Sequence, residues 1–488
     1  MTSLTAFLPE LVLLLGALGL FVLTLRAASG TRARHAAAAM GCLAFLASLL
    51  SVHDHATLFS GAYRVDEFSQ LLKLALTAGF TAIIILSRDL PDIREKVRPE
   101  YFLFLTLSAT GVIMLVSCID ALTLVIALEL SSFPLYLLVA MRREREGQRA
   151  QMESAIKYIM FGVAANAVML FGLSYLFGLT GTTNIPLMVS RLAPVAATPL
   201  AVAGLALTFA GFLYKLAVFP FHFWTPDVYQ GASNETTSLI ASLPKVGAGA
   251  VLVRFVSLAT PGNHVIATVL TVLAVASMFY GNLIALAQKD FKRLLGFSAI
   301  AHAGYAMVGF VSLTTAGYAA ALYYVTGYML MVLACFVVIS RVSHDGENIG
   351  IEALAGLHRR SPLLAVTLII GLFGLAGIPP FVGFWGKLFM LTAALGTGHL
   401  ALVVIAMINA AIAIYYYLNV VRHAVFGENS RSVNAPPIAL DWPTRGLCVA
   451  LIIAIVALGV LPSKLLNGYS RSVAATTAPV ESTTVAVR

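Results

Sequence analysis

The stretch FLYKLAVFPFHFWTPD, residues 212–227, places a lysine at the end of a long apolar run and follows it with two prolines. Lys215 comes after twenty-three uncharged residues, Leu192 to Tyr214, and before Pro220 and Pro226. A proline inside a helix removes a backbone hydrogen-bond donor and clashes with the preceding turn. The stretch therefore predicts a hydrophobic helix that is interrupted beside a buried ammonium group.

The rest of the chain has the composition of a membrane protein. Of its 488 residues, 59% are hydrophobic and 11% are charged, whereas a soluble globular domain has about 25% charged residues. Several runs exceed twenty apolar residues and are long enough to cross a hydrocarbon core of about 30 Å. Alternating short strands, which are typical of membrane β-barrels, are not found. We therefore predict an all-α polytopic membrane protein.

Charge and cysteine content exclude several other classes. The net charge of +9 sits mainly in short loops between apolar segments, which indicates membrane topology rather than nucleic-acid binding. The four cysteines lie in apolar segments and form no C-x-x-C pair, so iron–sulfur and zinc sites are not expected. No Walker or dinucleotide fingerprint is present. We expect no cofactor in this chain.

Fourteen segments are expected to form transmembrane helices. The twelfth is long and contains GIPPFVGFWGK, with Pro379 and Pro380 as a second expected helix break. Residues after Leu465 are expected to form a polar, mobile tail. The expected ranges are 4–25, 36–53, 66–88, 100–118, 120–140, 151–178, 198–225, 235–258, 264–287, 292–311, 316–341, 361–396, 399–422 and 444–462.

The distribution of basic residues predicts the orientation. Twenty of the 31 lysines and arginines fall in the loops after the first, third, fifth, ninth, eleventh and thirteenth helices. Six lie on the opposite face and five lie inside predicted helices. Because cytoplasmic loops are enriched in lysine and arginine, both termini are expected on the outer face.

Three lysines and one glutamate lie deep in predicted helices and are the best candidates for function. A charged group at the bilayer centre costs roughly 2.5–3.5 kcal/mol, so such residues usually face a bundle interior or a water-filled path. Lys215, Glu129 and Lys245 are each nine or more residues from the next charge on either side. Lys387 is the only charged residue between 361 and 421, His399 aside. The alternative for each is a structural ion pair.

Four further residues have weaker claims. Lys157 follows Glu153 by four residues, so a surface ion pair is an equal alternative. His302 is either a hydrogen-bonded core histidine or a proton relay, because imidazole titrates near neutral pH. His222 follows Lys215 by two helical turns and shares its face unless Pro220 alters the helix. Lys73 is expected to be a helix-end anchor.

Proton movement is the chemistry that fits these residues. Transporters build ion sites at midplane from broken helices in corresponding places of two halves, and a break with a lysine occurs here at 215/220 and again at 379/387. A nearby carboxylate favours the charged form of a lysine. Movement of Glu129 relative to Lys215 would therefore switch whether the lysine holds its proton.

Three motifs carry a family resemblance. YKLAVFPFHFWTPDVYQGA at 214–232, KDFKRLLGFSAIAHAGYAMVG at 289–309 and GIPPFVGFWGKLFML at 377–391 resemble the antiporter-like subunits of respiratory complex I. The WTPDVYQGA form resembles the N-type branch, the bacterial equivalent of mitochondrial subunit 2. The resemblance covers roughly residues 60 to 425. It implies fourteen helices in two inverted five-helix repeats, with discontinuous helices 7 and 12.

The resemblance also implies a division of the chain and roles for its residues. The N-terminal helices would be 1–99, the repeats 100–258 and 259–424, and helix 14 with a polar tail 425–488. The segment 233–244, SNETTSLIASLP, departs from the family pattern. By the match, Glu129 pairs with Lys215, Lys245 is the central lysine, Lys387 lies near the exit, Lys157 belongs to helix 6, and His222 and His302 are relay histidines.

The function implied is that of a proton-translocating subunit of NADH:quinone oxidoreductase in a bacterial inner membrane, with both termini periplasmic. FMN, iron–sulfur clusters and quinone would belong to partner subunits. The expected partners are the M-type subunit, small membrane subunits, the lateral helix of the L-type subunit and lipids. Two alternatives stay open. One is a subunit of a multi-subunit Na⁺/H⁺ antiporter or membrane-bound hydrogenase, and the other is a structural membrane spacer.

Overall fold

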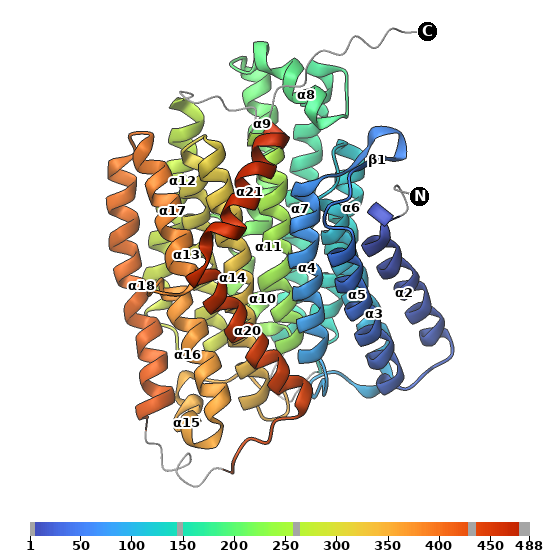
Figure 1. The fold of residues 1–488 in the computed structure, drawn as a ribbon, viewed down its shortest axis with the longest axis vertical. Coiled ribbons are helices and arrows are strands. Elements are labelled where there is room, and N and C mark those ends of the chain that lie inside the picture. The colour runs from blue at the N-terminus through green and yellow to red at the C-terminus, as the bar shows by residue number, and fades with distance from the viewer. Residues whose placement is uncertain (1–4, 144–149, 257–263, 428–435, 478–488) are drawn as a thin grey trace.

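The computed structural model describes residues 5–143, 150–256, 264–427 and 436–477. Long helices run from one end of the molecule to the other in a single bundle (Figure 1). Within the described residues, the only strands are a short antiparallel pair, β1 (Ala56–Leu58) and β2 (Tyr63–Val65). The prediction of an all-α polytopic protein is confirmed.

The helices that correspond to predicted spans differ in length. They are α2 (Leu8–Leu25), α3 (Gly30–Leu50), α4 (Glu67–Leu86), α5 (Arg98–Leu115), α6 (Ala121–Ala140), α7 (Ala150–Thr180), α9 (Pro199–Leu216), α11 (Asn234–Val256), α12 (His264–Ala285), α13 (Phe291–Val311), α14 (Thr315–Val342), α16 (Pro362–Ala376), α17 (Val382–Gly396), α18 (Leu400–Phe426) and α20 (Trp442–Val460). The shorter helices are α8 (Ile185–Leu192), α10 (Trp224–Gly231), α15 (Leu357–Arg360) and α21 (Pro462–Thr477).

Among the described residues, twelve helices are long and apolar enough to cross a membrane. The fourth predicted span is α5, whose first turn carries Arg98 and Glu100. The twelfth is the pair α16 and α17, each too short to cross alone. The described helices thus account for all fourteen predicted spans. Helices α11 and α13 are wholly buried and form the centre of the bundle.

The two predicted helix breaks are present. Helix α9 ends at Leu216, where Ala217 has a positive φ of 66°, and the chain passes Pro220 before α10 begins. Helix α16 ends at Ala376, where Gly377 has a φ of 86°, and Pro379 and Pro380 precede α17. A left-handed residue ends a helix because it turns the backbone away from the helical axis. The predicted spans 198–225 and 361–396 are therefore each interrupted, as predicted, and α10 extends beyond the first range to Gly231.

The prediction of a polar, mobile tail after Leu465 is wrong for the described part of that segment. Residues 462–477 form α21, in which Tyr469 and Val473 are fully buried. The Tyr469 hydroxyl shares a 2.9 Å hydrogen bond with the Thr326 hydroxyl of α14. Buried side chains four residues apart share one helix face, and the polar residues between them masked that face in the hydropathy pattern. Residues 478–488 lie outside the described residues.

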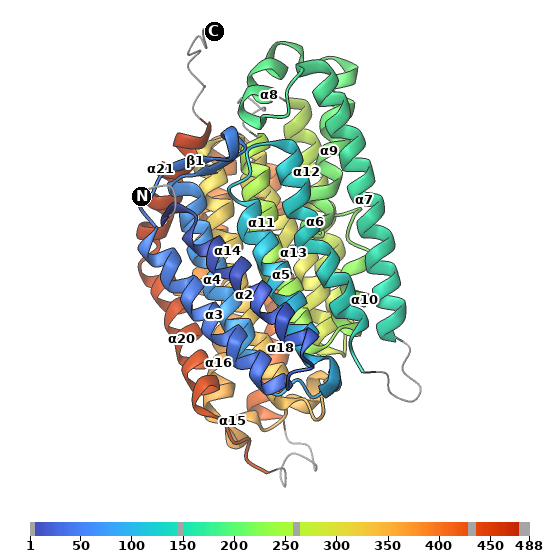
Figure 2. The same cartoon turned by 90° about the vertical axis from the view of Figure 1, so that its right-hand side faces the viewer.

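The helices begin and end at two opposite ends of the bundle. Helix α2 begins, and α21 ends, at the end of the bundle that also carries the β1–β2 pair and α8 (Figures 1 and 2). The loop before α5, helix α10 and helix α15 lie at the opposite end. The predicted boundary between residues 258 and 259 falls in 257–263, outside the described residues, as do most of the basic loop 142–150 and both chain ends.

Candidate functional site

Lys215 lies in the last turn of α9, next to the first helix break. Its side chain is only 6% exposed, and its Nζ donates a 2.5 Å hydrogen bond to the Ser132 hydroxyl of α6. A small cavity borders the same ammonium and is also lined by Ser131 and Pro244. The lysine is therefore held within the bundle by a neutral acceptor.

Glu129 lies one helical turn before Ser132 on α6, so both residues share a face. Its Oε1 accepts a 2.5 Å hydrogen bond from the Asn166 amide of α7. No salt bridge joins Glu129 to Lys215 among the described side chains. The pair expected from the resemblance is thus open in this arrangement, with each member bound to a neutral partner.

The ammonium groups of two other lysines bind the carboxyl ends of the broken helices α9 and α16. Lys245 Nζ donates a 2.8 Å hydrogen bond to the carbonyl of Leu216, the last residue of α9. Lys387 Nζ donates 3.0 Å hydrogen bonds to the carbonyls of Leu375 and Ala376 at the end of α16. The last carbonyls of a helix have no partner inside it and carry the negative end of its dipole. Each ammonium therefore stabilises a helix end inside the bundle.

His302 of α13 is buried and lies beside the same small cavity as Lys245. Its Nδ1 lies 2.5 Å from the Tyr324 hydroxyl and its Nε2 lies 2.9 Å from the Tyr417 hydroxyl. A second small cavity is lined by His302, Lys245 and Tyr324. On the next turn of α13, the Tyr305 ring centre lies 4.7 Å from Lys387 Nζ.

Together these residues form a line of titratable groups across the bundle. It runs from Lys215 on α9 to Lys245 on α11, His302 on α13 and Lys387 on α17. All four side chains are buried. One small cavity is lined by both Lys245 and His302, and another is lined by Lys215, so proton transfer between neighbouring groups through the bundle interior is chemically reasonable. The structure brings together four of the seven predicted site residues in this line.

Lys157 does not belong to the line. Its Nζ lies 2.6 Å from Glu153 and 2.7 Å from Asp227 of α10, and the lysine side chain is 37% exposed. Arg293 completes the cluster with a 2.8 Å contact to Asp227. The predicted surface pair with Glu153 is confirmed, and Lys157 is part of an ion-pair network at the end of the bundle.

His222 also lies apart from Lys215. The helix break places it in the turn between α9 and α10, so the shared helical face expected for the two residues does not exist. Its ring packs against Tyr280, with ring centres 4.2 Å apart. Neither ring nitrogen has a hydrogen-bond partner among the described residues.

The residues that complete the site were not singled out from the sequence. Ser132, Asn166 and Tyr305 are uncharged, and buried hydroxyl and amide groups are common in membrane helices. For two of them, the sequence contained a feature that could have identified them. Ser132 follows Glu129 by three residues, and Asn166 is the one asparagine in α7. Their role depends on which charged group they face.

The fold and the site define a class of protein. It is a polytopic helical membrane protein with two broken helices and a line of buried titratable groups between them. A family model described as "NADH:quinone oxidoreductase/Mrp antiporter, TM" matches residues 118–413. The chain belongs to this family.

Relatives that match nearly the whole chain are named as one subunit. NADH-quinone oxidoreductase subunit N 2 of Opitutus terrae is 65% identical and the match covers 97% of this chain and 98% of the relative. The protein of the same name in Syntrophobacter fumaroxidans is 44% identical, with 95% and 97% covered.

Solved structures share the fold. A chain of respiratory complex I from Thermus thermophilus with bound aureothin has a TM-score of 0.81 at 31% identity, covering 94% of this chain and 98% of that chain. A chain of the Mrp complex from a Dietzia species has a TM-score of 0.86 at 20% identity, covering 98% of both chains. The second likeness concerns the fold alone.

Proposed function

We propose that this chain translocates protons as a membrane-arm subunit of a proton-pumping NADH:quinone oxidoreductase. The observation that carries the proposal is the line of buried groups from Lys215 to Lys387, which connects the two helix breaks. The names of the full-length relatives support the same function. Intramembrane ionisable residues that face a bundle interior are typical of proton relays.

The open Glu129–Lys215 pair supplies a switch. In this arrangement Asn166 holds the carboxylate and Ser132 holds the ammonium. A rotation that brings the two together would favour the charged lysine, and their separation would favour release of its proton. Lys245 is the next group on the line, because it binds the carbonyl of the residue that follows Lys215.

Beyond Lys245, the proton would pass through the cavity to His302 and then to Lys387. The hydroxyls of Tyr324 and Tyr417, which contact His302, can each either donate or accept a hydrogen bond. Lys387 would be the last buried group of the line. His222 and Lys157, which lie off the line, would then modulate proton entry at the α10 end rather than carry the central transfer.

The wider assembly is part of the same proposal. Partner subunits would hold FMN, the iron–sulfur clusters and quinone, and the M-type subunit, small membrane subunits and the lateral helix of the L-type subunit would contact this chain. The location would be a bacterial inner membrane, with both termini periplasmic and helices 4–8 and 9–13 forming inverted repeats. Purification of the tagged chain should co-purify flavin and NADH dehydrogenase activity.

The test of the function is NADH-driven proton uptake in inverted membrane vesicles, normalised to assembled complex. Lys245→Ala removes the group between Lys215 and the cavity, so proton uptake should fall. Lys464→Ala, at an exposed residue of α21, is the matched control and should pump as the unmodified protein does. Normal uptake in Lys245→Ala would refute the relay. Sodium transport without NADH would instead favour the antiporter alternative.

A further inference from the structure

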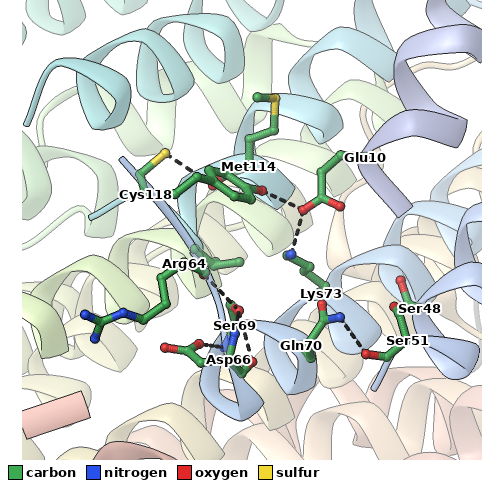
Figure 3. Close-up of polar contacts among 12 residues, drawn as sticks. Glu10, Ser48, Ser51, Arg64, Asp66, Ser69, Gln70, Lys73, Met114 and Cys118 are labelled. Atoms are coloured by element: carbon green, nitrogen blue, oxygen red, sulfur yellow. Dashed lines mark hydrogen bonds and ion pairs between the residues drawn. The ribbon is translucent and has the colours of Figure 1, made fainter. Parts of the chain in front are cut away.

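A buried ion pair lies outside the line of relay groups. Glu10 of α2 and Lys73 of α4 point toward each other (Figure 3), with 2.6 Å between Lys73 Nζ and Glu10 Oε1. Both side chains are fully buried. Lys73 is therefore not the helix-end anchor expected from the sequence, because its ammonium does not reach the membrane surface.

Tyr63 of β2 is the third member of this site. Its hydroxyl donates a 2.5 Å hydrogen bond to Glu10 Oε1, the oxygen that also contacts Lys73. The Lys73 ammonium lies 5.4 Å from the centre of the Tyr63 ring. One carboxylate oxygen thus accepts the Tyr63 hydrogen bond and forms the ion pair with Lys73, whose ammonium has no hydrogen-bond partner among the described residues. The other, Glu10 Oε2, is buried and has no hydrogen-bond partner among the described residues.

Polar groups continue on both sides of the pair. The Gln70 amide of α4 donates 2.6 Å to the carbonyl of Ser51, and the Thr77 hydroxyl lies 3.2 Å from the Ser48 hydroxyl of α3. Like Glu10 Oε2, three other buried oxygens have no hydrogen-bond partner among the described residues. These are Gln70 Oε1, Ser51 Oγ and Ser117 Oγ. Since buried polar atoms are usually paired, these unpaired oxygens leave acceptor positions in the region of the ion pair.

The site lies at the end of the bundle that carries the β1–β2 pair and α8, which the distribution of basic residues predicts to face the outer phase. Glu10 is in the first turn of α2, and Lys73 is in the second turn of α4, beside the β1–β2 pair. Other charged or titratable groups around it are Arg64, Cys118, Asp66 and Arg254 of α11 (Figure 3). Arg254 contacts the Val116 carbonyl at 2.8 Å and lies 3.7 Å from Asp66, which caps α4.

We propose that Glu10, Lys73 and Tyr63 form a proton-exchange site that serves release to the outer aqueous phase. The inference rests on the proposed proton translocation. In the exchange step, an N–H bond of the Lys73 ammonium breaks and an O–H bond forms on Glu10, which leaves both side chains neutral. The carboxylic acid then gives its proton to outer water, and the Lys73 amine takes up the next proton.

A purely structural clamp is the competing role, and a double variant separates the two. A buried ion pair can often be replaced by neutral side chains without loss of stability, whereas removal of one partner is strongly destabilising. Glu10→Gln together with Lys73→Met should therefore assemble. The readout is the number of protons translocated per NADH oxidised, because poorer assembly lowers both quantities and leaves their ratio unchanged.

The expected result is a lower ratio in the double variant and a smaller decrease in Tyr63→Phe, which keeps the ion pair. The matched control is Glu67→Gln with Arg471→Met, which removes an exposed pair between α4 and α21 and should keep the normal ratio. An unchanged ratio in the double variant would identify the pair as a clamp. Should the double variant not assemble, an unchanged ratio in Tyr63→Phe would overturn the proposal.

Lys245→Ala is measured in parallel to separate this inference from the proposed function. A lower ratio in Lys245→Ala with a normal ratio in the Glu10/Lys73 double variant would refute the outer exchange site alone. Normal ratios in both would refute the proton relay as well.

Discussion

The Lys245 ammonium donates a hydrogen bond to the carbonyl of Leu216, so a side chain of α11 binds the end of the neighbouring broken helix. Lys387 binds the end of α16 in the same manner. In both places a break creates unpaired carbonyls inside the bundle, and a lysine satisfies them. Membrane helices tolerate a break only where the freed backbone groups find such partners. The same lysines that stabilise the breaks are available for proton transfer.

Lys387→Ala should lower proton pumping and also weaken the bundle modestly. The variant loses two hydrogen bonds from a charged donor, each worth roughly 1.5–3 kcal/mol at most. We expect assembled complex in the membrane with reduced proton uptake in inverted vesicles. Lys387→Arg should keep the charge and much of the stability but should still fail in pumping, because arginine does not release its proton. Unchanged pumping in Lys387→Ala would assign the residue to structure.

Glu129 and Lys215 should behave as one unit. Glu129→Gln removes the charge that controls the lysine, and Lys215→Met removes the group that is controlled, so each single variant blocks the same switch. The double variant should therefore lower proton uptake little more than the more damaging single variant does. The measurement is NADH-driven proton uptake, normalised to assembled complex. Strictly additive losses would mean that the two residues act separately.

Ser132→Ala should impair the same switch without removing a charge. The Lys215 ammonium would lose its neutral acceptor and would have Glu129 as the nearest alternative. We expect a lower rate of proton uptake with normal assembly. Ser174→Ala is the matched control, because the exposed Ser174 hydroxyl of α7 donates to the Phe171 carbonyl of its own helix. Equal effects of the two variants would argue against a specific role for Ser132.

Stability at the end of the bundle opposite α8 should depend on the ionisation of Asp441. Burial raises the pKa of Asp441, but the hydrogen bond from Thr444, the ion pair with Arg88 and the nearby Arg341 outweigh it and hold the pKa below its ordinary value. Because the pKa of Asp441 is lowered by folding, its ionised form stabilises the folded state fully above the unfolded pKa of about 3.9. This stabilisation is lost as pH falls through the folded pKa.

Asp441→Asn should therefore lower the free energy of unfolding at pH 7, by about 1 kcal/mol or less since the pair is partly exposed. The difference from the unmodified protein should shrink as pH falls below about 4. Thermal unfolding of the purified complex at several pH values measures it. A difference that does not change with pH would exclude this ion-pair contribution.

Topology can be tested with single cysteines at two exposed positions. Thr57→Cys lies in β1 and Asp345→Cys lies in the turn after α14, at opposite ends of the bundle. The distribution of basic residues predicts that Thr57→Cys reacts from the outer side and Asp345→Cys from the inner side. Reaction of both from one side would overturn the predicted orientation.

Hydropathy and proline placement determined the architecture from the sequence alone. Long apolar runs must form helices in a membrane, since no water is present to bind the backbone, and the breaks at Pro220 and at Pro379–Pro380 follow from proline itself. Isolated charges such as Lys245 and Lys387 were identifiable because each stands in a long uncharged run, where a charge without a function or a partner is costly in a membrane.

Only the tertiary structure decided what each of these charges contacts. Glu129 binds Asn166 rather than Lys215, and Lys73 meets Glu10 of a distant helix instead of the membrane surface. The buried face of α21 was likewise not predictable from the sequence, because it is defined by the packing of α21 against α14. Helix formation is governed by local sequence and solvent, whereas side-chain partners depend on how helices are rotated and packed against one another, which no local pattern specifies.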